Sequence, residues 1–218
     1  MTNLSKEQGV SLPTGFTLQH PVAPPARPDF AALREDRDPH WSQSQFQRGK
    51  SLAYVRCLQN CVYYNPRGGQ PTKHTIDKWV RLASGEKFTA ASLGFVADCW
   101  PYVVEAHRPS KAEAAAKKAR GESVPFPPNA VFWYPTVVLN LEVKKALPKE
   151  GLEWLQLRVQ AKQIKSGRMD LEVLILDEHG DLVAISSHVN LVLGSERNTA
   201  ERGGGDSDAA DKGPASRI

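Results

Sequence analysis

Apolar and polar residues alternate with a period of two through most of the second half of the chain. Apolar side chains take alternate positions in four segments, 137–143, 155–159, 169–175 and 183–191. Turn-forming residues separate these segments, at Pro148–Gly151, Lys165–Gly167 and Asp177–Gly180. Such alternation is typical of strands that bury one face. We therefore predict four antiparallel strands in a meander with one polar face.

Two segments upstream, Tyr54–Tyr64 and His74–Leu82, have the aromatic and β-branched content of strands. The turn-forming residues Asn65–Gly69 lie between them. This arrangement predicts a hairpin before the meander.

The segment Thr89–His107 carries its apolar residues at helical spacing, after a threonine that can serve as N-cap. Pro101 cannot donate a backbone hydrogen bond, so we expect the helix to kink or end beside Asp98. Residues 109–130 are rich in Ala, Lys and Pro and predict a flexible connection with a short exposed helix at 111–120. One helix between a hairpin and a four-stranded sheet is an α+β layout in which the sheet wraps around the helix, the hotdog fold.

The two ends of the chain differ from this central part. Prolines recur through residues 12–40 and predict an extended arm along a surface. The last residues are rich in Gly and charge, which predicts a disordered tail. We therefore divide the chain into an arm at 1–49, a hotdog domain at 50–195 and a tail at 196–218.

Net charge is only +4, and part of it comes from a short Lys/Arg run at 111–120. No nucleic-acid motif accompanies that run, so we predict no nucleic-acid partner. Three cysteines lack the spacing of metal ligands, which favours a reducing, cytoplasmic setting and no cofactor. No stretch is long enough to span a membrane. The last residues, Ser216-Arg217-Ile218, resemble a weak peroxisomal address.

Four segments together resemble a known family: Trp79–Ala83, Ser92–Pro101, Pro135–Leu141 and Asp181–His188. They are similar to the second half of the acyl-CoA thioesterase II type, and in particular to the thioesterase-like proteins of filamentous fungi. The resemblance covers residues 50–195. Members of this family carry two hotdogs in tandem, which implies that residues 1–49 are the remnant of a first one. Activity would then require the missing half or pairing of two copies through the uncovered surface.

The resemblance also implies a site. In the family, an Asp on the helix, a Thr at a strand start and a Gln on the last strand position a water, and here they match Asp98, Thr136 and His188. An Asp in an apolar helix is costly unless it is bonded or functional. His188 could hold the water, act as a base, or be a solvated residue of the polar face.

Strict alternation conflicts with this site, because it places Thr136 and His188 on the face away from the helix. Pro135 relieves the conflict for Thr136 if the strand begins there. For His188 a bulge at Ser186–Ser187 would be needed.

Three functions remain open. The first is hydrolysis of acyl-CoA or of carrier-bound acyl or polyketide chains by an Asp-activated water, without a covalent nucleophile. The second is a non-catalytic acyl-binding or assembly module, and the third, less favoured, is an enoyl-thioester hydratase. The sequence therefore leaves open whether this chain is an enzyme.

Overall fold

The computed structural model describes residue 18 and residues 22–44 and 56–194. One antiparallel sheet contains, in order across it, β1 (Trp41–Gln43), β2 (Cys61–Pro66), β3 (Thr75–Leu82), β6 (Leu155–Lys165), β7 (Arg168–Asp177), β8 (Leu182–Leu191) and β5 (Thr136–Val143). A short pair, β4 (Phe132–Trp133) and β9 (Leu193–Gly194), lies apart from it. The predictions for the tail at 196–218, its last three residues and the first residues of the arm lie outside the described residues.

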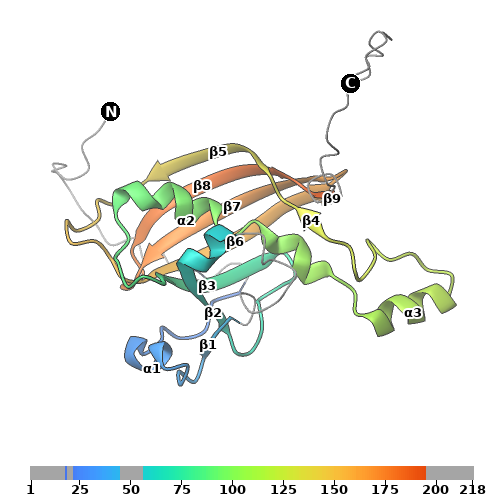
Figure 1. The fold of residues 1–218 in the computed structure, drawn as a ribbon, viewed down its shortest axis with the longest axis horizontal. Helices are drawn as coiled ribbons and strands as arrows, with labels where there is room; N and C mark the ends of the chain where they lie inside the picture. The colour runs from blue at the N-terminus through green and yellow to red at the C-terminus, as the bar shows by residue number, and fades with distance from the viewer. Residues whose placement is uncertain (1–17, 19–21, 45–55, 195–218) are drawn as a thin grey trace, which may run out of the picture.

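The helical segment crosses one face of this sheet (Figure 1). It begins with the 3-10 turn η5 (Ala90–Ser92), continues as α2 (Leu93–Asp98) and resumes as the 3-10 helix η6 (Tyr102–His107). α2 contacts β5, and η6 contacts β6. The α+β hotdog prediction is therefore confirmed, with the sheet curving around a central helical segment.

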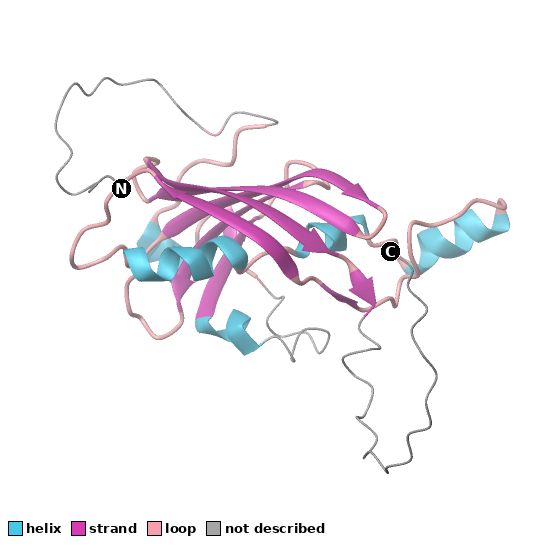
Figure 2. Ribbon diagram, turned by 90° about the horizontal axis from the view of Figure 1, so that it is seen from above, coloured by secondary structure: helices cyan, strands magenta, loops and turns pink. Residues whose placement is uncertain are grey.

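The helical segment forms where it was predicted, but as three short helices and not as one continuous helix. α2 ends at Asp98, as expected from the missing donor at Pro101. Thr89 is the N-cap of the segment, as expected, and the Ser92 hydroxyl accepts from its backbone N–H at 3.0 Å. The exposed helix α3 (Lys111–Ala119) forms as predicted and projects from the body (Figure 2).

The hairpin of β2 and β3 is confirmed, although a 3-10 helix, η4 (Arg56–Asn60), precedes a strand that begins only at Cys61. The predicted meander is correct for β6, β7 and β8 and wrong for β5. That strand pairs with β8 at the sheet edge, while β6 pairs with β3. The helical segment crosses the sheet before β5 begins, so β5 need not lie beside the strand that follows it in the chain. The alternation of residues along a strand does not indicate which strand it pairs with.

Two β-bulges change which residues face the helix. Val137 is the extra residue of β5, and Val183 is the extra residue of β8. Opposed residues share a face, so the pairing of His188 with the core residue Leu171 places His188 on the helix side. The bulge that sequence alternation required therefore exists, at Val183 and not at the expected Ser186–Ser187.

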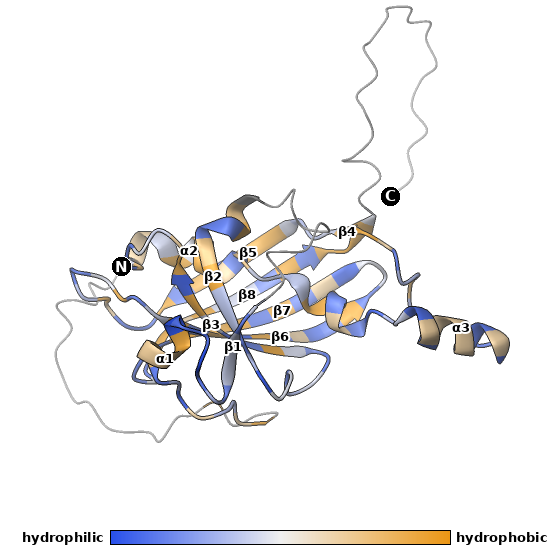
Figure 3. Ribbon diagram, turned by 60° about the horizontal axis from the view of Figure 1, so that its bottom comes forward, coloured by the Kyte–Doolittle hydropathy of each residue, from blue (hydrophilic) through white to orange (hydrophobic). Residues whose placement is uncertain are grey.

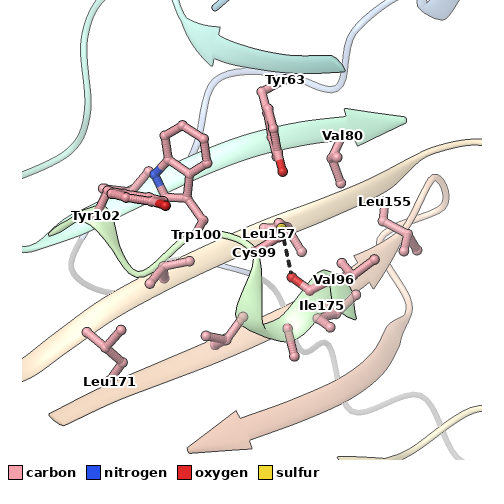
Figure 4. Packing of buried hydrophobic residues seen from close by; sticks show 14 of the residues in the cluster. Tyr63, Val80, Val96, Cys99, Trp100, Tyr102, Leu155, Leu157, Leu171 and Ile175 are labelled. Carbon is pink, nitrogen blue, oxygen red and sulfur yellow. Dashed lines mark hydrogen bonds between the residues drawn. The ribbon is translucent and has the colours of Figure 1, made fainter. Parts of the chain in front are cut away.

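The alternation itself is visible along β5 to β8 (Figure 3). On β6 and β7 it places the predicted residues in the core between sheet and helix. Figure 4 shows Cys99 of the helical segment beside Leu157 of the sheet and Val96 beside Ile175. After the bulge in β8, the apolar residues of that strand lie on the outer face instead.

The arm is more structured than predicted. It forms α1 (Phe30–Arg34) and the edge strand β1, and it covers the outer face of the sheet near β2, β3 and β6. A second apolar cluster forms there, made of Leu33, Trp41, Tyr64, Trp79 and Trp154. The polar face was predicted only for the four strands within residues 137–191, so this apolar cluster over β2 and β3 lies outside that prediction.

A buried ion pair lies under the arm. The Arg158 guanidinium donates to both oxygens of the Asp77 carboxylate at 2.7 Å, and both residues are almost fully buried. The same guanidinium donates to the Val22 carbonyl at 2.8 Å. This pair therefore joins two neighbouring strands and the arm by charge-assisted hydrogen bonds.

We predict that Asp77→Ala lowers the free energy of unfolding by about 3–5 kcal/mol, because it leaves a buried cation without its partner. Urea denaturation measures the change. The matched control is Glu142→Ala, which removes the exposed partner of Lys144 and should cost less than about 1 kcal/mol. Equal losses in the two variants would contradict the prediction.

Candidate functional site

The structure brings the three predicted site residues together. Asp98 is the last residue of α2, Thr136 is the first of β5, and His188 lies on β8. The Thr136 hydroxyl donates to Asp98 Oδ1 at 2.6 Å. His188 Nδ1 lies 3.8 Å from the same oxygen. All three side chains therefore meet where the helix ends over the sheet.

Thr136 is oriented from the opposite side by Asn190. The Asn190 amide donates to Thr136 Oγ1 at 2.7 Å, and Asn190 is fully buried on β8. Because the bulge at Val137 follows directly, Thr136 faces the helix and pairs across the strands with Asn190. Asn190 therefore donates a hydrogen bond to Thr136, and Thr136 donates one to Asp98.

The tautomer of His188 follows from Ser186. The Ser186 hydroxyl donates its proton to the Asn140 carbonyl at 2.7 Å. Its oxygen also lies 2.7 Å from His188 Nε2, and with its proton committed it can only accept there. His188 therefore carries its proton on Nε2, and the lone pair of Nδ1 faces Asp98.

Burial and charge act on His188 in opposite directions. The residue is 4% exposed, and burial lowers its pKa below the ordinary 6.5, while the nearby Asp98 carboxylate partly raises that pKa again. The imidazole is therefore neutral near pH 7. The Asp98 side chain is 45% exposed. The site thus combines a buried base with an acceptor that a ligand can reach.

The position of Asp98 has no evident structural reason. A carboxylate at the last residue of a helix gains nothing from the helix dipole, which favours cations there. Its described partner is Thr136, which is itself held by a buried amide. The carboxylate is therefore held at one oxygen by Thr136 while much of the side chain stays exposed.

Sequence reasoning missed Ser186 and Asn190. Together with His188 they occupy alternate positions of β8, and Ser187 is the one further polar residue of that strand. That period-two pattern was available in the sequence. The bulge that turns these residues inward was expected at Ser186–Ser187, at least three residues downstream of its position at Val183.

The described segments contain neither a metal-binding cluster nor a membrane-spanning helix. They bring together no group of three histidine, cysteine or acidic side chains suited to a metal. None of their helices combines the length and the apolar character needed to cross a bilayer.

Comparisons with known proteins agree on one family. Residues 21–192 match the family described as the acyl-CoA thioesterase C-terminal domain. The thioesterase-like protein TwmA of Talaromyces wortmannii is 37% identical over 217 residues. The match covers 93% of this chain and 61% of that protein, so the chain spans less than two thirds of the length of this relative. The family match begins inside the predicted arm, which agrees with the packing of the arm on the sheet.

Solved structures with a similar arrangement have low sequence identity. A putative thioesterase of Novosphingobium aromaticivorans DSM 12444 is 20% identical with a TM-score of 0.43, covering 64% of this chain and 46% of that one. A putative thioesterase II of Thermobifida fusca YX is 20% identical with a TM-score of 0.44, covering 62% and 46%.

We predict that His188 is protonated on Nε2 at pH 7.5 and titrates below pH 6.5, because Ser186 accepts from Nε2 and burial disfavours the cation. Nitrogen-15 NMR of labelled histidine measures both properties. Asp98→Asn should lower the His188 pKa further, since it removes the charge that raises it. A His188 resonance protonated on Nδ1, or an unchanged pKa in Asp98→Asn, would contradict the assignment.

Proposed function

The chain belongs to the family of acyl-CoA thioesterase C-terminal domains, and on that premise we propose that it hydrolyses acyl thioesters with a water held between Asp98 and His188. The observation that carries the proposal is the separation of Asp98 Oδ1 and His188 Nδ1, 3.8 Å. This is too long for a direct hydrogen bond and short enough for one water to reach both atoms.

Both atoms are hydrogen-bond acceptors. A bridging water would therefore donate both of its protons, one to each side chain, and direct its oxygen lone pairs outward. The exposed edge of Asp98 leaves that side open to a substrate carbonyl. Thr136 and Asn190 hold the carboxylate, and Ser186 holds the imidazole, so the nucleophile is oriented before the substrate arrives.

We assign the base to His188, since an imidazole is more basic than a carboxylate. The water oxygen attacks the carbonyl carbon of the thioester, and one water proton passes to Nδ1. The Asp98 carboxylate stabilises the imidazolium that forms. When the tetrahedral intermediate collapses, the carbon–sulfur bond breaks and the imidazolium returns its proton to the sulfur. The products are a carboxylic acid and a free thiol.

The substrates within this proposal are acyl-CoA or acyl and polyketide chains on a carrier. Pairing with a second hotdog surface belongs to the same proposal. β5 is an edge strand, and its residues Val137 and Val138 are 59% and 44% exposed next to Thr136. Exposed apolar residues on an uncovered edge favour pairing. A second copy, or the rest of a longer chain, would cover them.

The same contact favours a second candidate function. A hydratase adds water across an enoyl thioester and also uses an Asp with a His, and here Asp98 and His188 lie side by side. The two reactions differ in their products, because hydration keeps the thioester bond and releases no thiol. An assay of thiol release together with loss of the enoyl absorbance separates them.

We predict that Asp98→Asn lowers the rate of thiol release from acyl-CoA by about 10²–10⁴-fold, because it removes the charge that stabilises the imidazolium and one of the two acceptors that hold the water. A thiol reagent with a panel of acyl-CoAs measures it. Asp170→Asn is the matched control, because Asp170 pairs with Arg168 on an exposed part of β7 and should leave the rate unchanged. Thiol release by folded Asp98→Asn at the wild-type rate would contradict the proposed role.

A separate prediction concerns pH. In the wild type, kcat/KM should fall as the pH drops through the His188 pKa, below 6.5, because protonation occupies the Nδ1 lone pair. His188→Gln keeps an acceptor but cannot take the proton, so it should lose this acidic limb and at least about 10²-fold in kcat. Wild-type kcat in His188→Gln would instead make Asp98 the base.

A further inference from the structure

A second hydrogen bond joins the helical segment to the start of β5, beside the one between Thr136 and Asp98. The Tyr134 hydroxyl donates to Glu105 Oε1 at 2.6 Å. Glu105 lies on η6, seven residues after Asp98. Tyr134 lies two residues before Thr136. The two hydrogen bonds therefore connect the same two stretches of chain.

The Glu105 carboxylate is oriented from a second side by Arg108. The Arg108 Nε donates to Glu105 Oε2 at 2.7 Å, and the two residues form an ion pair. Another nitrogen of the same guanidinium donates to the Pro128 carbonyl at 3.0 Å. Each oxygen of the carboxylate therefore accepts from a different residue, and Oε1 is the one directed to Tyr134.

Tyr134 is buried, and its ring packs edge-on against Tyr102 of η6 with ring centroids 5.3 Å apart. Burial raises the pKa of Tyr134, and the hydrogen bond to Glu105 raises it further. The hydroxyl therefore keeps its proton and donates it to the carboxylate. A hydrogen bond to a carboxylate is charge-assisted and stronger than one between neutral groups.

The backbone at the start of β5 is supported from one side of the sheet. β5 is an edge strand, so within the described sheet it pairs with β8 alone. Pro135 has no N–H to donate, and its carbonyl accepts from the Leu191 N–H at 3.0 Å. Upstream, the connection 109–131 includes the projecting helix α3, which buries none of its residues. The height of this strand start below the helical segment therefore depends on side-chain contacts such as that of Tyr134.

We propose that Glu105 and Tyr134 are positioning residues, whose hydrogen bond sets the separation between the helical segment and the start of β5 and so keeps the Thr136 hydroxyl on Asp98. This rests on the proposed hydrolase function, in which Asp98 is held before the substrate arrives. Both residues act through Thr136 and do not touch the reacting atoms. A misplacement of about 1 Å can cost about 10²-fold in rate, so loss of this bond should be visible in kcat.

Tyr134→Phe tests the proposal, because it removes the hydroxyl and keeps the ring against Tyr102. It should lower kcat for thiol release by about tenfold with little change in KM, since Thr136 orients the carboxylate and not the substrate. Tyr64→Phe is the matched control. It removes another buried tyrosine hydroxyl, which accepts from Arg81 at 3.3 Å under the arm, and it should leave kcat unchanged.

A double-mutant cycle tests whether Glu105 acts through Tyr134. Glu105→Ala should lower kcat as much as Tyr134→Phe does, and the two substitutions together should lower it no further. Glu105→Gln keeps a hydrogen-bonding partner for the Tyr134 hydroxyl and should recover part of the loss. Additive losses in the double variant, or wild-type kcat in folded Tyr134→Phe, would overturn the proposal.

NMR of methyl-labelled threonine follows Thr136 without turnover. Three-bond couplings to its methyl carbon report the χ1 rotamer, which should be single in the wild type and averaged in Tyr134→Phe. An unchanged single rotamer in Tyr134→Phe would contradict the positioning role. Absence of thiol release by the wild type would instead count against the hydrolase function, and the rotamer of Thr136 would still decide the role of Tyr134.

Discussion

The direction in which β8 points its polar side chains depends on one extra residue, Val183. Downstream of it, a strand that would have buried valine and isoleucine buries serine, histidine and asparagine instead. Burying three polar side chains is unfavourable unless each is hydrogen-bonded. Ser186 and His188 bond to each other, and Asn190 donates to Thr136. Because of the bulge, these buried side chains are stable only when they are hydrogen-bonded. The network that they form orients Asp98 and His188.

A second bulge makes the network possible on the neighbouring strand. Val137 reverses the alternation only for the first residue of β5, so Thr136 turns inward while Val137 and Val138 remain exposed. The end of α2 supplies the third component, since Pro101 stops the helix at the residue that carries the carboxylate. Three local irregularities, two in strands and one in a helix, therefore converge at one point.

The same irregularities mark where sequence reasoning succeeds and fails. Period-two alternation located the strands β5 to β8, and the missing donor of Pro101 located the end of α2. Alternation cannot report a bulge, because one extra residue exchanges the two faces without changing composition. It also cannot report which strands pair, so β5 was placed beside β6 and not beside β8. Asp98, Thr136 and His188 came from resemblance to a family, and only the hydrogen bonds reveal Ser186 and Asn190 as their supports.

The arm has a practical consequence for anyone who produces this protein. Trp41 and Leu33 cover Trp79 and Trp154, and Val22 accepts from the buried Arg158. A shortened chain that starts at residue 50 would keep every residue of the candidate site. It would also open a tryptophan-lined sheet face to water, and such a surface recruits other chains. Expression of the smaller unit should therefore yield aggregates, and the smallest unit that stays dispersed should include residues from about Val22 onward.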